Sequence, residues 1–213
     1  MYNLPYYKEK DAALVLEFMK QHSFALIMGV DGEQKPVATQ IPLLFVERDG
    51  QLFLHGHIMK GADHHRAFEK NKEVLAVFTG PHAYVSASWY ENKQQASTWN
   101  YMTVHAKGEL LFLDDAALLV MLDELTSHYE NNPSSPSLYK ELPDEYVRRL
   151  TKAIVAFEIK VTSLDHVFKL SQNRDKKSFE NIVERLQNGD HESKAVAEAM
   201  NRCRNQPGFP DCE

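Results

Sequence analysis

The hydrophobic pattern divides the chain into one N-terminal helix, a series of short strands and several later helices. Apolar residues recur at helical spacing from Ala12 to Met19, and Asp11 before them is a candidate N-cap. Runs typical of β-strands then follow, with tight-turn signals at residues 31–32 and 49–50. The predicted strands of this part cover residues 24–30, 37–46, 51–57 and 74–79. We expect an antiparallel meander in which Pro36 and Pro42 mark an edge or a bulge.

The second half of the chain adds further strands and most of the helices. Strands are predicted at residues 84–86, 101–113 and 153–161, and helices at 60–68, from 115, from 144, at 175–187 and at 191–204. The alternating βα units of a doubly wound sheet are absent from this pattern. Closing an antiparallel sheet removes its exposed edges. The sequence therefore predicts an α+β protein built around a closed, six-stranded antiparallel β-barrel, with peripheral and C-terminal helices.

Composition and charge narrow the class of protein. The 213 residues are 43% hydrophobic and carry 24 basic against 30 acidic side chains, a formal charge of −6. This composition excludes disorder, and the charge excludes a strongly basic DNA-coating protein. Neither a leader pattern nor an apolar stretch long enough to span a membrane is present, so we expect a soluble, cytoplasmic protein without membrane contact. Cys203 and Cys212 are expected to be reduced thiols.

The histidines near the fourth strand suggest two kinds of site. His55 and His57 share one face of that strand, and His64 and His65 follow, but no cysteine or close carboxylate completes a ligand set, so we expect no metal. The stretch from Gly56 through His57 and Lys60 to Gly61 places a cation at a strand end before a helix, which suits a phosphate. A solvated turn explains the same residues equally well.

Aromatic side chains gather in one stretch that includes both tryptophans. Trp89, Tyr90, Trp99 and Tyr101 lie within thirteen residues. They are interleaved with the polar residues Ser86, Ser88, Thr98 and Asn100. The rings could form core, but an apolar core would not select these polar neighbours unless they had partners. A flat heteroaromatic ligand with polar edges, such as a flavin, would account for both.

Several motifs in this order resemble the PaiB family, which is described as FMN-binding negative transcriptional regulators. They are GPHAYVS at 80–86, SWY at 88–90, TWNY at 98–101 and KLSQNR at 169–174. The resemblance spans nearly the whole chain and implies a split barrel like those of pyridoxamine-phosphate oxidases and flavin reductases. It also implies a homodimer with FMN at the dimer interface. We expect the split-barrel domain at residues 1–170 and a C-terminal helical extension packed on it at 171–213.

The resemblance also implies which residues bind FMN. Lys60, helped by His57, is the candidate for the phosphate, and Thr39, Ser86 and Asn100 are candidates for the ring or the ribityl chain. Lys169, Gln172 and Asn173 belong to a late segment expected to reach the flavin of the partner subunit. The expected cofactor-binding set is completed by Trp89, Thr98 and Tyr101. The family usually has proline where this chain has Ala87 and Ser97, so we expect a looser aromatic loop.

Two classes of function remain open from the sequence. One is a flavin-dependent regulator; the alternative is an FMN-dependent oxidoreductase of the flavin-reductase or pyridoxamine-phosphate-oxidase type. A haem-handling split barrel is a weaker third reading. His57, His82 and His105 are equally eligible as catalytic groups, so none is assigned. Residues 174–206 carry seven basic and six acidic side chains, so any DNA binding is expected from the dimer rather than from the last two helices alone.

Overall fold

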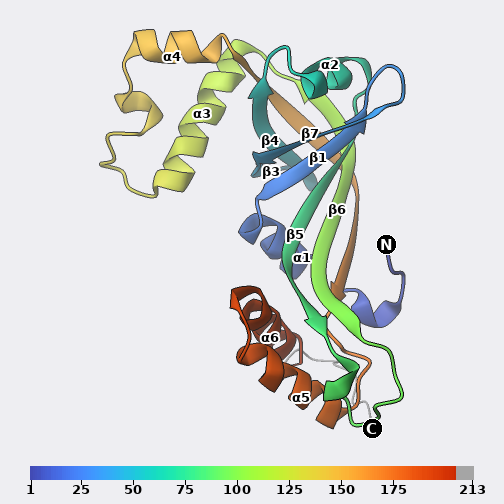
Figure 1. Cartoon of the computed structure of the whole chain (residues 1–213). Coiled ribbons are helices and arrows are strands. Elements are labelled where there is room, and N and C mark those ends of the chain that lie inside the picture. Colours follow the sequence, from blue (N-terminus) through green and yellow to red (C-terminus); the bar gives the residue numbers. More distant parts are fainter. Residues whose placement is uncertain (205–213) are drawn as a thin grey trace. The chain divides into compact units, whose positions relative to one another are not determined.

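The chain folds into an antiparallel sheet with accompanying helices (Figure 1). The computed structural model describes residues 1–204. Its strands are β1 (Phe24–Val30), β2 (Pro36–Pro42), β3 (Leu44–Arg48), β4 (Gln51–Met59), β5 (Glu73–Val85), β6 (Thr98–Phe112) and β7 (Ile154–Lys169). Its α-helices are α1 (Ala12–Gln21), α2 (Asp63–Lys70), α3 (Asp115–Glu130), α4 (Asp144–Thr151), α5 (Lys176–Gln187) and α6 (His191–Arg204). Short 3-10 helices are η1 (Pro5–Tyr7), η2 (Ala87–Trp89) and η3 (Tyr139–Glu141). The predicted α+β class is confirmed.

The sheet has seven strands in the order β2-β1-β5-β6-β7-β4-β3, so the predicted number of six is wrong. The predicted strand at 37–46 divides into β2 and β3 at Leu43. Pro42 has no N–H to continue a ladder, and the Leu43 N–H donates instead to the Ser23 carbonyl oxygen at 2.9 Å. The predicted strands at 74–79 and 84–86, in contrast, are parts of one strand, β5.

The order of the sheet ends at β2 and β3. The edge predicted from Pro36 and Pro42 therefore lies where expected, on β2. Because β2 and β3 are end strands, the hydrogen-bonded ladder is open, in contrast to the closed barrel that the sequence pattern predicts. Even so, β2 approaches β4, which pairs with β3.

Local side-chain chemistry explains where several elements begin. Asp11 caps α1 by accepting a hydrogen bond from the Ala13 N–H at 2.8 Å, and Asp114 caps α3 through the Ala117 N–H at 2.8 Å. Between β3 and β4, Asp49 and Gly50 both have positive φ, 53° and 74°. Positive φ at both central residues is the geometry of a two-residue hairpin turn, so this predicted turn is confirmed.

The chain divides into two compact units, which we describe separately. The central unit consists of residues 23–78 and 105–164, and its core includes Ile27, Leu54, Phe78 and Ile159. The terminal unit consists of residues 1–22, 79–104 and the described residues from 165 onward. Its buried apolar residues include Phe18, Val85, Val104, Val167 and Met200. The boundary expected at residue 170 stays a prediction.

The C-terminal helices α5 and α6 pack against each other in the terminal unit (Figure 1). The apolar residues Val196, Ala199 and Met200 of α6 are buried, which leaves these positions unavailable to read DNA. Cys203, near the end of α6, carries a free thiol whose pKa is raised by burial to about 11. Cys212 lies outside the described residues.

Candidate functional site

A buried lysine at the end of β7 is the main feature of the terminal unit. Lys169 is 9% exposed, and its ammonium donates to the Thr98 hydroxyl and to the Trp99 carbonyl oxygen, the latter at 3.0 Å. The same nitrogen lies 5.6 Å from the centre of the Tyr2 ring. Within residues 1–204, no carboxylate forms an ion pair with it. Burial, followed by the nearby Arg174 charge, lowers the pKa of Lys169.

Arg174 is the second cation of this region. Its guanidinium carbon lies 4.1 Å from the centre of the Tyr90 ring, and it donates to the side-chain oxygen of Gln95. Tyr90 is fully buried, and its hydroxyl has no hydrogen-bond partner among the described residues. We refer to Tyr2, Thr98, Trp99, Lys169 and Arg174 as the Lys169 cluster. It combines two cations with aromatic rings, an arrangement suited to a flat anionic ligand.

Asn100 and Ser171 hold the late segment against β6. Both are buried, and the Asn100 amide donates to the Ser171 hydroxyl at 2.9 Å while the hydroxyl donates back to the Asn100 side-chain oxygen at 3.1 Å. Ser171 has a φ of 63°, a left-handed conformation that is unusual for serine. The Asn100 amide, a candidate for contact with the flavin, is thus already engaged within the protein.

Tyrosines surround the cluster. The Tyr7 hydroxyl lies 3.5 Å from the side-chain oxygen of Asn173, at the limit of a hydrogen bond, and burial raises the pKa of Tyr7 to about 12. Burial, and then the neighbouring Tyr2, also raise the pKa of Tyr101. Both phenols are therefore neutral at physiological pH and can only donate or accept hydrogen bonds.

The loop between β5 and β6, residues 86–97, carries Trp89 and Tyr90 and packs on α5. Ser86 caps η2 by accepting from the Ser88 N–H at 3.2 Å, and the Trp89 carbonyl oxygen accepts from the Asn181 amide at 3.0 Å. The Ala87 N–H donates to the Ser97 hydroxyl at 3.0 Å. A proline at position 87 could not make this bond, because it has no N–H. The two positions that depart from the family pattern are thus bonded to each other.

Three expected site residues lie in the central unit. Thr39 is half-buried on β2, opposite Ile27, and His57 is half-buried on β4. Burial lowers the pKa of His57, so its ring is neutral at pH 7. Lys60 follows β4 immediately, and its ammonium lies 3.8 Å from the Asp115 carboxylate. The Lys60 side chain is 40% exposed, and water screens its attraction to Asp115. The ion pair is therefore weak and leaves Lys60 free to bind an anion.

The remaining histidines of this region have local partners. His55 lies 2.9 Å from the Glu158 carboxylate, and His64 lies 3.0 Å from that of Asp63. Over residues 1–204, no three His, Cys, Asp or Glu side chains are grouped so as to hold a metal ion. In the same part of the chain, none of the helices has the length and apolar character needed to cross a membrane.

The structure thus brings some of the expected site residues together and separates others. Thr98, Tyr101, Lys169 and Asn173 gather around the cluster, whereas Ser86 and Trp89 belong to the loop on α5. Gln172 instead bonds to its own segment, through the Phe168 carbonyl oxygen at 2.5 Å and the Leu170 N–H at 2.8 Å. The expected cofactor-binding set does not include Tyr2, Tyr90, Ser171 or Arg174, although Tyr90 belongs to the aromatic stretch and the last two to the late segment expected to reach the flavin. The only sequence signal for the last two is their place in the KLSQNR motif.

Known proteins resemble this chain in sequence. Residues 1–163 match the family described as "Putative FMN-binding domain". The chain is 35% identical over 201 residues to protease synthase and sporulation protein PAI 2 of Bacillus subtilis, covering 94% of this chain and 96% of that protein.

Solved structures share the fold at low sequence identity. An FAD and haem binding protein from Mycobacterium smegmatis matches with a TM-score of 0.54 and 18% identity, over 76% of this chain and 72% of the other. A conserved hypothetical protein from Mycobacterium tuberculosis matches with a TM-score of 0.55 and 11% identity, over 79% and 91%. The chain belongs to the PaiB family of FMN-binding split-barrel proteins.

Proposed function

We propose that this PaiB-family protein is a homodimeric, flavin-dependent regulator. In this proposal the Lys169 cluster of one subunit contacts the flavin, and Lys60 of the other subunit binds its phosphate. FMN supplies a flat ring system with polar edges, a ribityl chain and a phosphate. The chain supplies cations, aromatic surfaces and hydrogen-bond donors that suit each part.

The observation that carries the proposal is the buried Lys169 ammonium. Its two hydrogen-bond partners among the described residues, the Thr98 hydroxyl and the Trp99 carbonyl oxygen, are both neutral. Burying a cation without a counter-ion is unfavourable, which is why the pKa of Lys169 is lowered. An anionic group bound at the cluster would offset this cost. The buried Tyr90 hydroxyl beneath Arg174 offers a further unused hydrogen-bonding group.

The phosphate contact rests on Lys60. Gly61 follows it with a φ of 76°, and the first turn of α2 comes next. The N-cap residue of α2, Ala62, makes no side-chain capping bond. Because His57 is neutral, its contribution would be a hydrogen bond rather than a charge. These features support a phosphate site in the central unit.

The homodimer is supported by the resemblance and by exposed aromatic surface. Trp99 is 52% exposed and Tyr84 is 49% exposed, although their rings lie edge to face with centroids 5.8 Å apart. Large rings that remain exposed in one chain are typical of a surface that another subunit covers.

A regulatory role is favoured over an enzymatic one by the chemistry of the cluster. Its ionisable side chains are a lysine, an arginine and a tyrosine, and it includes no carboxylate or histidine. Such groups bind and orient a flavin, and the histidine of the proposed site, His57, is assigned to the phosphate and not to the ring system. Residues 174–206 have nearly balanced charge and α6 buries its apolar face, so we propose that DNA binding, if it contributes to regulation, belongs to the dimer as a whole.

Titration of the flavin-free protein with FMN tests the proposed site. Lys169→Met should weaken FMN binding about tenfold to a hundredfold, because a charge-assisted hydrogen bond is lost. Lys35→Met is the matched control, since Lys35 is exposed and pairs only with Glu33 in the described structure. Equal affinities of the two variants would contradict the proposal. Flavin absorption that bleaches on addition of NADH or NADPH would favour the oxidoreductase instead.

A further inference from the structure

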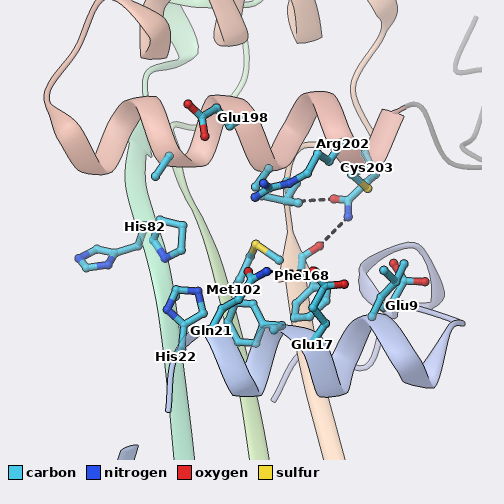
Figure 2. Close-up of a pocket in the computed structure, with 18 of the residues that line it drawn as sticks. Glu9, Glu17, Gln21, His22, His82, Met102, Phe168, Glu198, Arg202 and Cys203 are labelled. Atoms are coloured by element: carbon cyan, nitrogen blue, oxygen red, sulfur yellow. Dashed lines mark hydrogen bonds between the residues drawn. The ribbon is translucent and has the colours of Figure 1, made fainter. Parts of the chain in front are cut away.

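The terminal unit contains a cavity that lies apart from the Lys169 cluster. Its walls come from α1, α6 and the parts of β5, β6 and β7 that belong to this unit (Figure 2). The cavity has a volume of about 810 Å³. Cavities of this size are typical of small-molecule sites, and none of the functions discussed so far uses this one.

One part of the cavity wall is apolar and already ordered. Phe18 and Phe168 are almost fully buried, with ring centroids 5.0 Å apart. Met102 and Leu170 continue this surface, and Ala199 faces it from α6. A ligand with an apolar or aromatic body could therefore bind without a costly rearrangement.

The backbone separates this cavity from the Lys169 cluster. Phe168 and Leu170 line the cavity, whereas Lys169 between them bonds to Thr98 and Trp99. Gln172 also lines the cavity, but its side chain bonds to the backbone of Phe168 and Leu170.

The charged groups around the cavity favour a cation. Four carboxylates line it, from Glu9, Glu17, Glu192 and Glu198. Two of them have neutral hydrogen-bond donors within the wall: Glu192 accepts from the backbone N–H of His82 at 3.3 Å and lies 3.9 Å from the His82 ring, and Glu17 accepts from the Gln21 amide at 2.9 Å. The lining cations are Lys8, Lys10 and Arg202. The Lys8 ammonium already forms an ion pair, at 2.5 Å, with the carboxylate of Asp165, and Asp165 does not line the cavity. The pKa of His22 is lowered by burial, so that its ring adds no positive charge at pH 7.

We propose that this cavity binds an organic cation with an apolar, ring-bearing body. The body would lie on Phe18 and Phe168, where aromatic faces also attract a cation. The positive charge would be balanced by the carboxylates of α1 and α6, chiefly Glu17 and Glu192. Arg202 opposes such a ligand, so its charge should weaken binding.

Two probes of similar shape and opposite charge test this proposal. Calorimetric titration of the full chain with tetraphenylphosphonium should show saturable binding to one site per chain. Tetraphenylborate should bind at least about tenfold more weakly, because it meets the carboxylates with the wrong charge. Failure to bind tetraphenylphosphonium, or tighter binding of tetraphenylborate, would overturn the proposal.

Variants that remove either negative or positive charge from the cavity wall locate the binding site. The double substitution Glu17→Gln and Glu192→Gln should weaken tetraphenylphosphonium binding about tenfold, and Arg202→Gln should tighten it about threefold. Glu33→Gln, in the central unit, is the control and should change nothing. The same affinity in all variants would place the probe elsewhere and refute the cavity. FMN affinity should stay unchanged in every variant, so this test is independent of the proposed flavin site.

Discussion

Asn100 and Ser171 exchange two hydrogen bonds, at 2.9 and 3.1 Å, in the buried interior of the terminal unit. This pair joins β6 to the segment that begins at Lys169. Asn100 also approaches the Met200 sulfur of α6 at 3.5 Å. The position of the proposed flavin-binding lysine therefore depends on a buried polar contact between residues that are distant in sequence.

Asn100→Ala should destabilise the protein by about 2 kcal/mol, because it leaves the buried Ser171 hydroxyl without its partner. When Ser171→Ala is added to Asn100→Ala, the free energy of unfolding should fall little further, because the bond between the two side chains is already lost. Denaturant unfolding of both single variants and the double variant measures this coupling. Strictly additive effects would show that the two hydrogen bonds do not act as a pair.

Acidification should destabilise the flavin-free protein as the pH falls through the ordinary histidine pKa of about 6.5 and on toward the lowered pKa values of the folded state. Burial lowers the pKa of His22, His57 and His166 below the ordinary value of 6.5. The unfolded chain therefore binds protons first as the pH falls, and the stability present above the ordinary pKa is lost. His57→Gln should reduce the slope of unfolding free energy against pH over this interval. An unchanged slope would show that His57 titrates normally in the folded protein.

Gly108→Ala should destabilise the fold by about 1 to 3 kcal/mol. A Cβ at this position of β6 would lie 2.5 Å from the Lys160 carbonyl oxygen, a backbone atom of β7 that cannot move independently of its strand. Gly32→Ala is the control, because its Cβ would lie 3.2 Å from a methylene group of the flexible Lys70 side chain. In thermal unfolding, Gly108→Ala should lower the midpoint temperature more than Gly32→Ala does. Equal midpoints would contradict close packing of β6 against β7 at this position.

The protein should be a dimer in solution. Light scattering is expected to give twice the 24.5 kDa mass of one chain at micromolar concentration. A monomer mass under the same conditions would exclude a flavin site shared between subunits.

The sequence predicted those structural features that depend only on residues close together in the chain. The Asp11 cap and the turn at Asp49-Gly50 are local, since each side chain or dihedral angle acts within a few residues. The division of the strand at Leu43 was not predictable, because it depends on a hydrogen bond to Ser23 across the sheet.

The candidate site shows the same limit. The motifs identified Thr98, Asn100 and Lys169, and the structure places all three in the same unit. Tyr2 and Tyr90 were missed as neighbours of the two cations, because rings in an aromatic-rich sequence look alike until the fold brings them to a charge. Gln172, next to Ser171 in the motif, was expected at the flavin but lines the cavity beneath α6.

Mixed dimers test the central claim most directly. In the first preparation, a wild-type chain is paired with a chain that carries both Lys60→Ala and Lys169→Met. In the second preparation, a Lys60→Ala chain is paired with a Lys169→Met chain. If each site takes Lys60 and Lys169 from different subunits, the dimer of two single variants should hold one intact and one doubly damaged site. If both lysines of a site belong to one subunit, the same dimer should hold two singly damaged sites. FMN titration separates these cases, because our account predicts one site of wild-type affinity per dimer of a Lys60→Ala chain with a Lys169→Met chain. The dimer of wild-type and doubly substituted chains should hold two weakened sites. The reverse pattern would show that both lysines act within one subunit, and full occupancy at wild-type affinity in both preparations would contradict the proposed flavin site altogether.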